Sequence, residues 1–184
     1  MDYILCTTVE HLESAIATFS HSEYLVLDCE GRELGMRGGA LSLLSIGTAG
    51  GNEVFLIDAY VLLRDTPDAL DTPAIRSLAR LLECAELRKI VWDGRMDTVA
   101  LQEAFGATLA GVLDLQIAEI VSRVCRPEET DRKRRERLVP ATAGRSLHVP
   151  GPYQEMHALL GLEACLNLCK VGSEHKKNGR QSWT

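Results

Sequence analysis

The sequence lacks several features that would place it in a familiar class of protein. It has no run of about 20 apolar residues, so no membrane-spanning helix is predicted. Its first residues, MDYILCTTVEHLES, carry no basic leader before the short apolar stretch, so no signal peptide is predicted. The six cysteines form no CxxC pair and no zinc-ligand spacing. These absences favour an intracellular protein, cytoplasmic or nuclear, whose cysteines are free thiols.

Aromatic residues are also scarce, and the net charge is negative. The three Phe, four Tyr and two Trp are too few for an extended base-stacking surface. No GxGxxG or P-loop motif follows a predicted strand, which argues against an ordinary α/β nucleotide-binding domain. The net charge of −6 argues against non-specific binding of nucleic acid over the whole surface. It does not argue against a nuclease, because a carboxylate cluster that holds divalent cations is itself acidic.

The apolar residues that are present alternate between strand-like and helix-like patterns. Thr7 and Glu10 form a T-x-x-E capping box ahead of a helical pattern that ends near Phe19. Pro73 marks the first position of a later helix, and Gly106 closes another. Strands are predicted at 3–6, 24–28, 40–48, 53–59 and 88–92, with a hairpin turn at 49–52, and helices at 73–84, 94–105, 114–124 and 159–171. This order predicts an α/β fold.

Residues 126–152 interrupt this alternation. The part 126–137, RPEETDRKRRER, is highly charged, and the remainder is rich in Pro and Gly. We expect a mobile, solvated loop with room for one helical turn, because little apolar surface is available for burial. The basic run 132–137 could contact phosphate or act as a nuclear localisation signal. The plain alternative is a solvated loop whose charges are balanced by neighbouring acidic residues.

Asp28 and Glu30 form the first of two acidic motifs. They stand two apart at the end of the apolar segment YLVLDCE, and residues two apart in a strand point to the same side. Neighbouring carboxylates repel unless a proton or a cation lies between them, and Mg²⁺ prefers such oxygen ligands. Taken alone, the motif is more typical of a strand that ends in a solvated turn.

The second acidic motif is VWDGRMD, residues 91–97. Asp93 is placed to cap the helix that begins there, with its side chain accepting backbone N–H groups. Asp97 lies one helical turn later, where the helix dipole favours an acid, so a solvated surface acid is the plain alternative. Asp114 precedes the next helix, which we expect it to cap.

The two motifs and the elements around them occur in the order found in RNase D-like exonucleases of the DEDD type. The segment 25–59, LVLDCEGRELGMRGGALSLLSIGTAGGNEVFLIDA, resembles the first exonuclease motif and its hairpin. The segment 89–123, KIVWDGRMDTVALQEAFGATLAGVLDLQIAEIVSR, resembles the second motif and its helices. Within the family, DCEG and D-x-R-x-D are most similar to the Egalitarian-like branch of exonuclease 3′–5′-domain-containing proteins.

The resemblance implies an RNase H-like mixed sheet, with three antiparallel strands followed by parallel ones, flanked by helices. It also implies a metal-dependent 3′–5′ exonuclease that hydrolyses single-stranded RNA or DNA from the 3′ end with two Mg²⁺ or Mn²⁺ ions. Asp28 would bridge the ions, Glu30 would bind the ion that activates water, and Asp97 would hold the second ion. Asp114 matches an acidic position common in the family, and Asp93 stands where many active members carry Asn. Both are secondary candidates.

The family's third motif has no convincing counterpart between residues 126 and 184. That motif carries a Tyr or His and a fourth Asp, and QSWT at 181–184 resembles the stretch that precedes it. We therefore expect residues 1–184 to be a single domain cut before its third motif, with a natural short form as the alternative. A catalytically inactive nucleic-acid-binding or adaptor module on the same fold is the alternative function. A protein partner or a second copy of the chain remains open, as does the choice between RNA and DNA.

Overall fold

The computed structural model describes residues 2–64, 68–123, 125–127, 129–138 and 156–169. The chain divides into two compact units, Met1–Leu115 and Gln116–Thr184, which are treated separately below as the first unit and the second unit. Among the described helices, none has the length and apolar character needed to cross a bilayer. All six cysteines are free thiols, as predicted.

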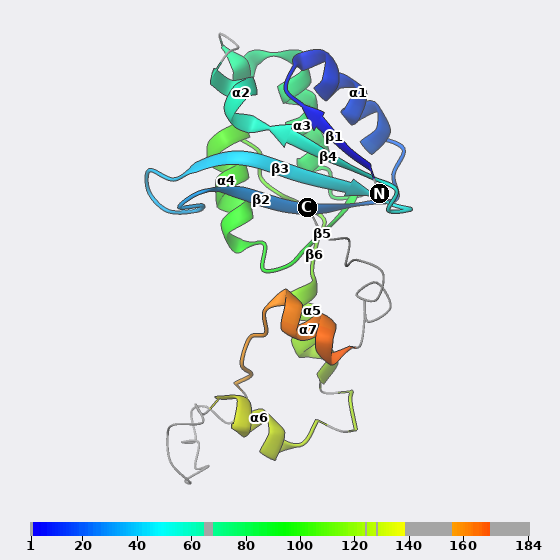
Figure 1. The fold of residues 1–184 in the computed structure, drawn as a ribbon, viewed down its shortest axis with the longest axis vertical. Helices are drawn as coiled ribbons and strands as arrows, with labels where there is room; N and C mark the ends of the chain where they lie inside the picture. Colours follow the sequence, from blue (N-terminus) through cyan, green and yellow to red (C-terminus); the bar gives the residue numbers. More distant parts are fainter. Residues whose placement is uncertain (1, 65–67, 124, 128, 139–155, 170–184) are drawn as a thin grey trace, which may run out of the picture. The chain divides into compact units, whose positions relative to one another are not determined.

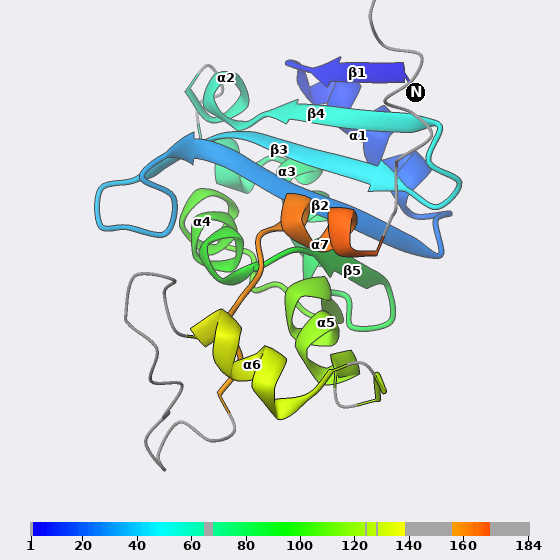
Figure 2. The same cartoon turned by 60° about the horizontal axis from the view of Figure 1, so that its bottom comes forward.

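A six-stranded sheet forms the first unit, with its strands in the order β1-β4-β3-β2-β5-β6 (Figure 1). The strands are β1 (Asp2–Cys6), β2 (Tyr24–Arg32), β3 (Ala40–Thr48), β4 (Glu53–Asp58), β5 (Arg88–Val91) and β6 (Val112–Asp114). β3 pairs antiparallel with β2 and β4 on its two sides, as the hairpin pattern predicts. β1 is added in parallel to β4 (Figure 2). On the other side, β5 is added in parallel to β2, and β6 in parallel to β5. The predicted mixed sheet is thus confirmed.

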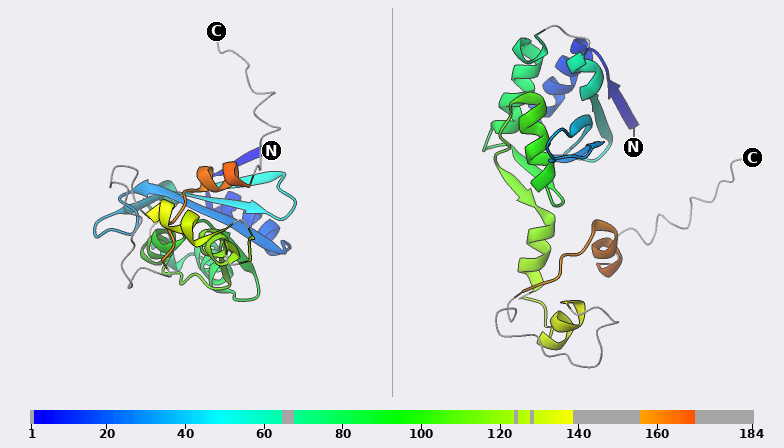
Figure 3. Two further views of the ribbon diagram at one scale, coloured as in Figure 1. Left: turned by 90° about the horizontal axis from the view of Figure 1, so that it is seen from below. Right: turned by 90° about the vertical axis from the view of Figure 1, so that its left-hand side faces the viewer.

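β2 carries the first acidic motif, and its two sides differ sharply. On one side Leu25, Leu27 and Cys29 are buried. On the other side Val26, Asp28 and Glu30 are exposed. This alternation is the period-2 pattern of a strand that packs one side against a core. Helices α1 (Val9–Phe19), α3 (Pro73–Glu83) and α4 (Arg95–Phe105) lie together on one side of the sheet (Figure 3). β2 continues beyond the predicted end, with a register shift between Glu30 and Gly31.

The helices of the first unit begin and end at residues suited to those positions. Thr72 caps α3 by accepting the Ile75 N–H, and Pro73 occupies the first helical position. α4 ends at Gly106, whose φ of 66° is the left-handed conformation that glycine adopts most easily. The capping box of α1 is wrongly predicted by one position, because the side chain of Thr8, not Thr7, accepts from the helix.

Short elements of the first unit are missing from the sequence-based prediction. α2 (Ala59–Arg64) follows β4 directly, and the Asp58 carboxylate accepts the Val61 N–H at its start. A 3₁₀ turn, η1 (Ala69–Asp71), and the strand β6 are shorter still, with three residues each. Elements of this length show too little periodicity for a pattern to predict them.

The second unit contains α5 (Leu115–Arg123), which begins at the last residue of the first unit, α6 (Asp131–Leu138) and α7 (Leu162–Leu168). Three side chains, Gln116, Arg123 and Arg134, donate to the carbonyls of Leu160, Ala158 and Met156 respectively. These bonds hold the segment 156–160 against α5 and α6. α6 is longer than the single turn expected within 126–152, and residues 139–152 of that expected loop lie outside the described residues.

Candidate metal centre

Asp28 and Glu30 lie on the exposed side of β2, as the two-residue spacing predicts. Cys29, between them, points to the opposite side and is buried. Burial raises the pKa of the Cys29 thiol, and the negative charges of Asp97, Asp28 and Glu30 raise it further. This thiol therefore stays protonated, and it is not a candidate metal ligand.

Asp97 lies in the first turn of α4 with only 8% of its surface exposed. Burial raises its pKa to about 6, and the negative charges of Asp28, Asp93, Glu30 and Asp114 act in the same direction. The solvated surface acid considered for this position is therefore wrong. A buried carboxyl among other carboxylates is an environment that a proton or a cation stabilises.

The turn between β5 and α4 is held in an unusual conformation. Asp93 has a φ of 55°, which is uncommon for a residue other than glycine. Gly94 follows it, and a Cβ at this position would lie 2.6 Å from Cγ2 of Val91. The close approach requires glycine here, so the turn brings α4 tightly against the end of β5.

Asp114, at the end of β6, stabilises this turn. Its two carboxylate oxygens accept the backbone N–H groups of Asp93, at 3.1 Å, and Gly94, at 3.2 Å. These groups are among the N–H groups at the start of α4 that have no partner within the helix. Asp114 thus fixes the beginning of the helix that carries Asp97. Its capping of α5 stays a prediction.

The prediction that Asp93 caps α4 is wrong. The N-cap residue is Gly94, without a side-chain cap, and the carboxylate of Asp93 instead accepts from Arg95 Nε at 2.5 Å and Nη2 at 2.9 Å. The hydrogen bonds and charge of Arg95 lower the pKa of Asp93. Arg95 therefore compensates much of the charge that Asp93 adds beside Asp97, a partnership that the sequence-based reasoning missed.

The chemistry of these residues suits a hard divalent cation. Asp28, Glu30 and Asp97 offer carboxylate oxygens, the ligands that Mg²⁺ and Mn²⁺ prefer. The negative charges of Asp28 and Glu30 both raise the pKa of Asp97, so the three carboxyl groups influence one another electrostatically. As the side chains stand, the described part of the chain has no three His, Cys, Asp or Glu residues gathered closely enough to hold a metal ion. The assignment of Asp28, Glu30 and Asp97 as metal ligands therefore stays a prediction.

The chain is similar to known exonucleases in sequence and in fold. A family model described as 3′-5′ exonuclease matches residues 3–129. The RNase D of Trypanosoma brucei, solved in complex with RNA U12, is similar over 67% of this chain and 40% of its own, with 28% identity and a TM-score of 0.55. The EXO domain of Aedes aegypti Nibbler shares the fold over 100% of this chain and 76% of its own, with 16% identity and a TM-score of 0.61. No curated protein matches. The chain spans about 40% of the length of the RNase D it resembles.

Proposed function

The chain belongs to the 3′–5′ exonuclease family, and from this premise we propose that it hydrolyses nucleic acid from the 3′ end at Asp28, Glu30 and Asp97. One observation carries the proposal. Asp28 and Glu30 on the exposed side of β2 and Asp97, buried in the first turn of α4, all lie within the residues that the exonuclease family model matches. Three carboxylates carried by one strand and the helix after the neighbouring strand suit metal-assisted phosphodiester hydrolysis.

Asp28, Glu30 and Asp97 would hold two Mg²⁺ or Mn²⁺ ions. When bound, such ions supply Lewis acidity for forming hydroxide and for stabilising the leaving oxygen. Asp97 would hold a cation in its deprotonated form, because metal ligands must be deprotonated. Asp114 holds the first turn of α4, and so the Asp97 backbone, in place through its bonds to the turn before the helix.

The substrate is a single-stranded 3′ end of RNA or DNA. The related RNase D was solved with RNA bound, which supports RNA as the first substrate to test. Arg32 and Arg37 are exposed at the end of β2 and in the connection that follows it. In a chain with a net charge of −6, these guanidinium groups supply local positive charge for phosphate contacts.

The alternative function is a nucleic-acid-binding or adaptor module without activity. Two observations favour it. The described residues contain no three ligands already gathered for a metal ion, and Asp93 stands where many active members of the family carry Asn. Both functions need nucleic-acid binding, and only the first needs bond cleavage.

The test is degradation of a 5′-labelled single-stranded RNA and its DNA counterpart with Mg²⁺ or Mn²⁺. We expect only slow stepwise shortening from the 3′ end, because the third motif has no convincing counterpart between residues 126 and 184. A circularised oligonucleotide should not be cleaved, and Asp28→Ala and Asp97→Asn should lose the remaining activity. Asp71→Asn is the matched control, because Asp71 is an exposed acid paired with Arg76 outside the site.

Binding of the same RNA, measured by fluorescence anisotropy, separates the two functions. RNA binding without shortening would favour the adaptor module. Shortening by Asp28→Ala at the wild-type rate would show that the catalytic site lies elsewhere.

A further inference from the structure

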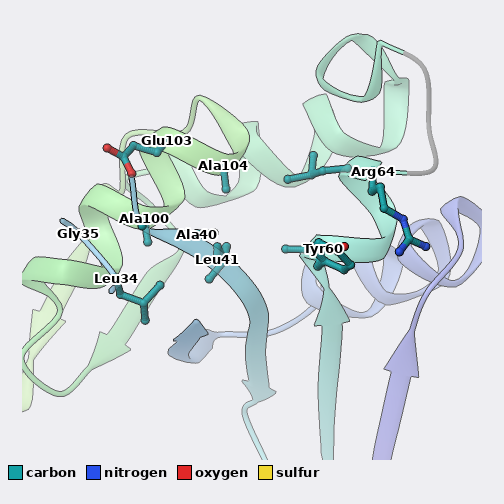
Figure 4. Close-up of a pocket in the computed structure, with 12 residues that line it drawn as sticks. Leu34, Gly35, Ala40, Leu41, Tyr60, Arg64, Ala100, Glu103 and Ala104 are labelled. Carbon is teal, nitrogen blue, oxygen red and sulfur yellow. The ribbon is translucent and has the colours of Figure 1, made fainter. Parts of the chain in front are cut away.

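Two adjoining cavities open on the surface of the first unit. The first, of about 390 Å³, is enclosed by α2, the later turns of α4 and the connection between β2 and β3 (Figure 4). The second, of about 510 Å³, lies between the end of α2, η1 and α4. Leu63, Glu103 and Ala104 line both cavities, so the two volumes form one continuous surface feature, which we call the α2–α4 groove.

The first cavity is the apolar part of the α2–α4 groove. Most of its lining is apolar, including Leu34, Leu41, Leu63, Ala100 and Ala104. Tyr60 of α2 lies on the side opposite α4, with 56% of its surface exposed (Figure 4). The guanidinium carbon of Arg64 lies 5.0 Å from the centroid of this ring. An exposed aromatic ring beside an apolar hollow is a surface that a large apolar side chain of another protein can cover.

The second cavity is the acidic part of the α2–α4 groove. Its charged lining residues, as far as the structure describes them, are Asp68, Asp71 and Glu103, and the exposed Leu70 lies beside them. Asp71 is paired with Arg76. Asp68 and Glu103 have no hydrogen bond or ion pair within the described part of the chain. Two carboxylates of the groove therefore keep a negative charge for which the described residues provide no cation.

A basic segment of another protein matches both parts of the groove. Lys and Arg combine a long apolar stem with a charged end, so such a residue can lie along Leu70 with its charge towards Asp68 and Glu103. A large apolar side chain a few positions away can fill the first cavity. Nucleic acid does not match, because the same carboxylates repel its phosphates. The charge of the groove thus favours a protein partner over RNA.

We propose that the α2–α4 groove docks a partner protein through a short segment that combines a large apolar residue with Lys or Arg. The apolar residue packs against Leu41 and Tyr60, and the basic residue pairs with Asp68 and Glu103. The proposal goes beyond the proposed function and does not depend on it, because none of the candidate metal ligands lines the groove.

The test selects binding peptides from a random library displayed on phage, with the full chain as the target. Enriched sequences should combine a large apolar residue with Lys or Arg a few positions away. The affinity of one enriched peptide is then measured by fluorescence anisotropy. Glu103→Lys should weaken its binding about tenfold or more, because attraction between opposite charges becomes repulsion between like charges. Exchanging the basic residue of the peptide for glutamate should restore binding to this variant.

Glu86→Lys is the matched control, because Glu86 is an exposed acid outside the groove and the change in net charge is the same. Asp68→Asn should also weaken binding, and so should Ala104→Phe, which fills the junction of the two cavities. Circular dichroism checks that the variants fold. Asp68→Asn keeps the test valid if Ala104→Phe does not fold, because asparagine tolerates the φ of 51° at this position.

A library that yields no peptides of this chemistry would overturn the proposal. Unchanged affinity of the enriched peptide for Glu103→Lys and Asp68→Asn would overturn it as well. Displacement of the bound peptide by single-stranded RNA would have the same consequence, because the groove would then belong to a nucleic-acid site. Shortening of RNA by the wild-type chain reports on the proposed function alone, so the two proposals can fail separately.

Discussion

Replacing Asp114 with alanine should loosen the start of α4 and with it the position of Asp97. The carboxylate of Asp114 accepts two consecutive backbone N–H groups, from Asp93 and Gly94. Hydrogen bonds to a charged group contribute about 1.5–3 kcal/mol each, and distances of 3.1 and 3.2 Å place these at the lower end. Because water can replace part of the loss at this half-buried site, we expect Asp114→Ala to lower the free energy of unfolding by about 2–3 kcal/mol.

The assay is urea denaturation followed by circular dichroism, together with hydrogen exchange of the amides at 93–97. For a chain of this size, a loss of about 2–3 kcal/mol lowers the melting temperature by about 4–12 °C. Asp114→Asn retains an acceptor oxygen and should cost about 1 kcal/mol. Asp71→Ala, which breaks an exposed ion pair, is the control and should cost less than about 1 kcal/mol.

Asp114→Ala should also have a local effect. In Asp114→Ala the amides of Asp93 and Gly94 should exchange faster, and metal binding should weaken, because Asp97 loses its fixed backbone. A variant as stable as Asp71→Ala, with unchanged exchange at these two amides, would show that Asp114 does not hold the turn.

Two further predictions concern buried charges. Asp97 has a pKa of about 6 in the metal-free fold against an ordinary value of 3.8, so the stability it contributes is present below pH 3.8 and lost as the pH rises through about 6. Asp97→Asn should therefore gain up to about 3 kcal/mol over the wild type at pH 7 in EDTA, and no gain at pH 4, in denaturation measured at both values. Arg123 is 1% exposed and pairs with Glu119 at 2.6 Å, so Arg123→Ala leaves the buried Glu119 with Arg126, at 3.2 Å, as its ion-pair partner. The variant should destabilise the second unit by about 1.5–3 kcal/mol, seen as faster exchange in α5. Arg132→Ala, in an exposed pair with Glu136, should change exchange little, and equal effects would contradict the argument.

The sequence predicts those parts of the fold that depend on local pattern. β2 alternates between buried and exposed positions, and α3 has a threonine cap followed by proline. Both elements can therefore be predicted from their own residues, without knowledge of the elements that pack against them. The acidic pair Asp28 and Glu30 follows from the same alternation. Asp97 gained significance only through the family resemblance, because one acid in a first helical turn is ordinary by itself.

The parts that the sequence does not predict depend on contacts between distant residues. Asp93 is of a residue type that often caps helices, yet in this turn its carboxylate accepts from Arg95. The carboxylate that serves the turn comes instead from Asp114, on a three-residue strand. No local pattern links residues that are about twenty positions apart, so only the folded sheet reveals this bond.

The pairing of β1 with β4 has a consequence for the order of folding. Tyr3 stands beside Val54 in this parallel pair, so about fifty residues must be ordered or looped before the contact closes. β2, β3 and β4 are neighbours both in sequence and in the sheet, and they can associate first. Until β1 docks, β4 is an unpaired edge with Phe55 and Ile57 in it, a segment prone to pair with another chain. By pairing with β4, β1 thus covers this edge and protects the sheet against aggregation.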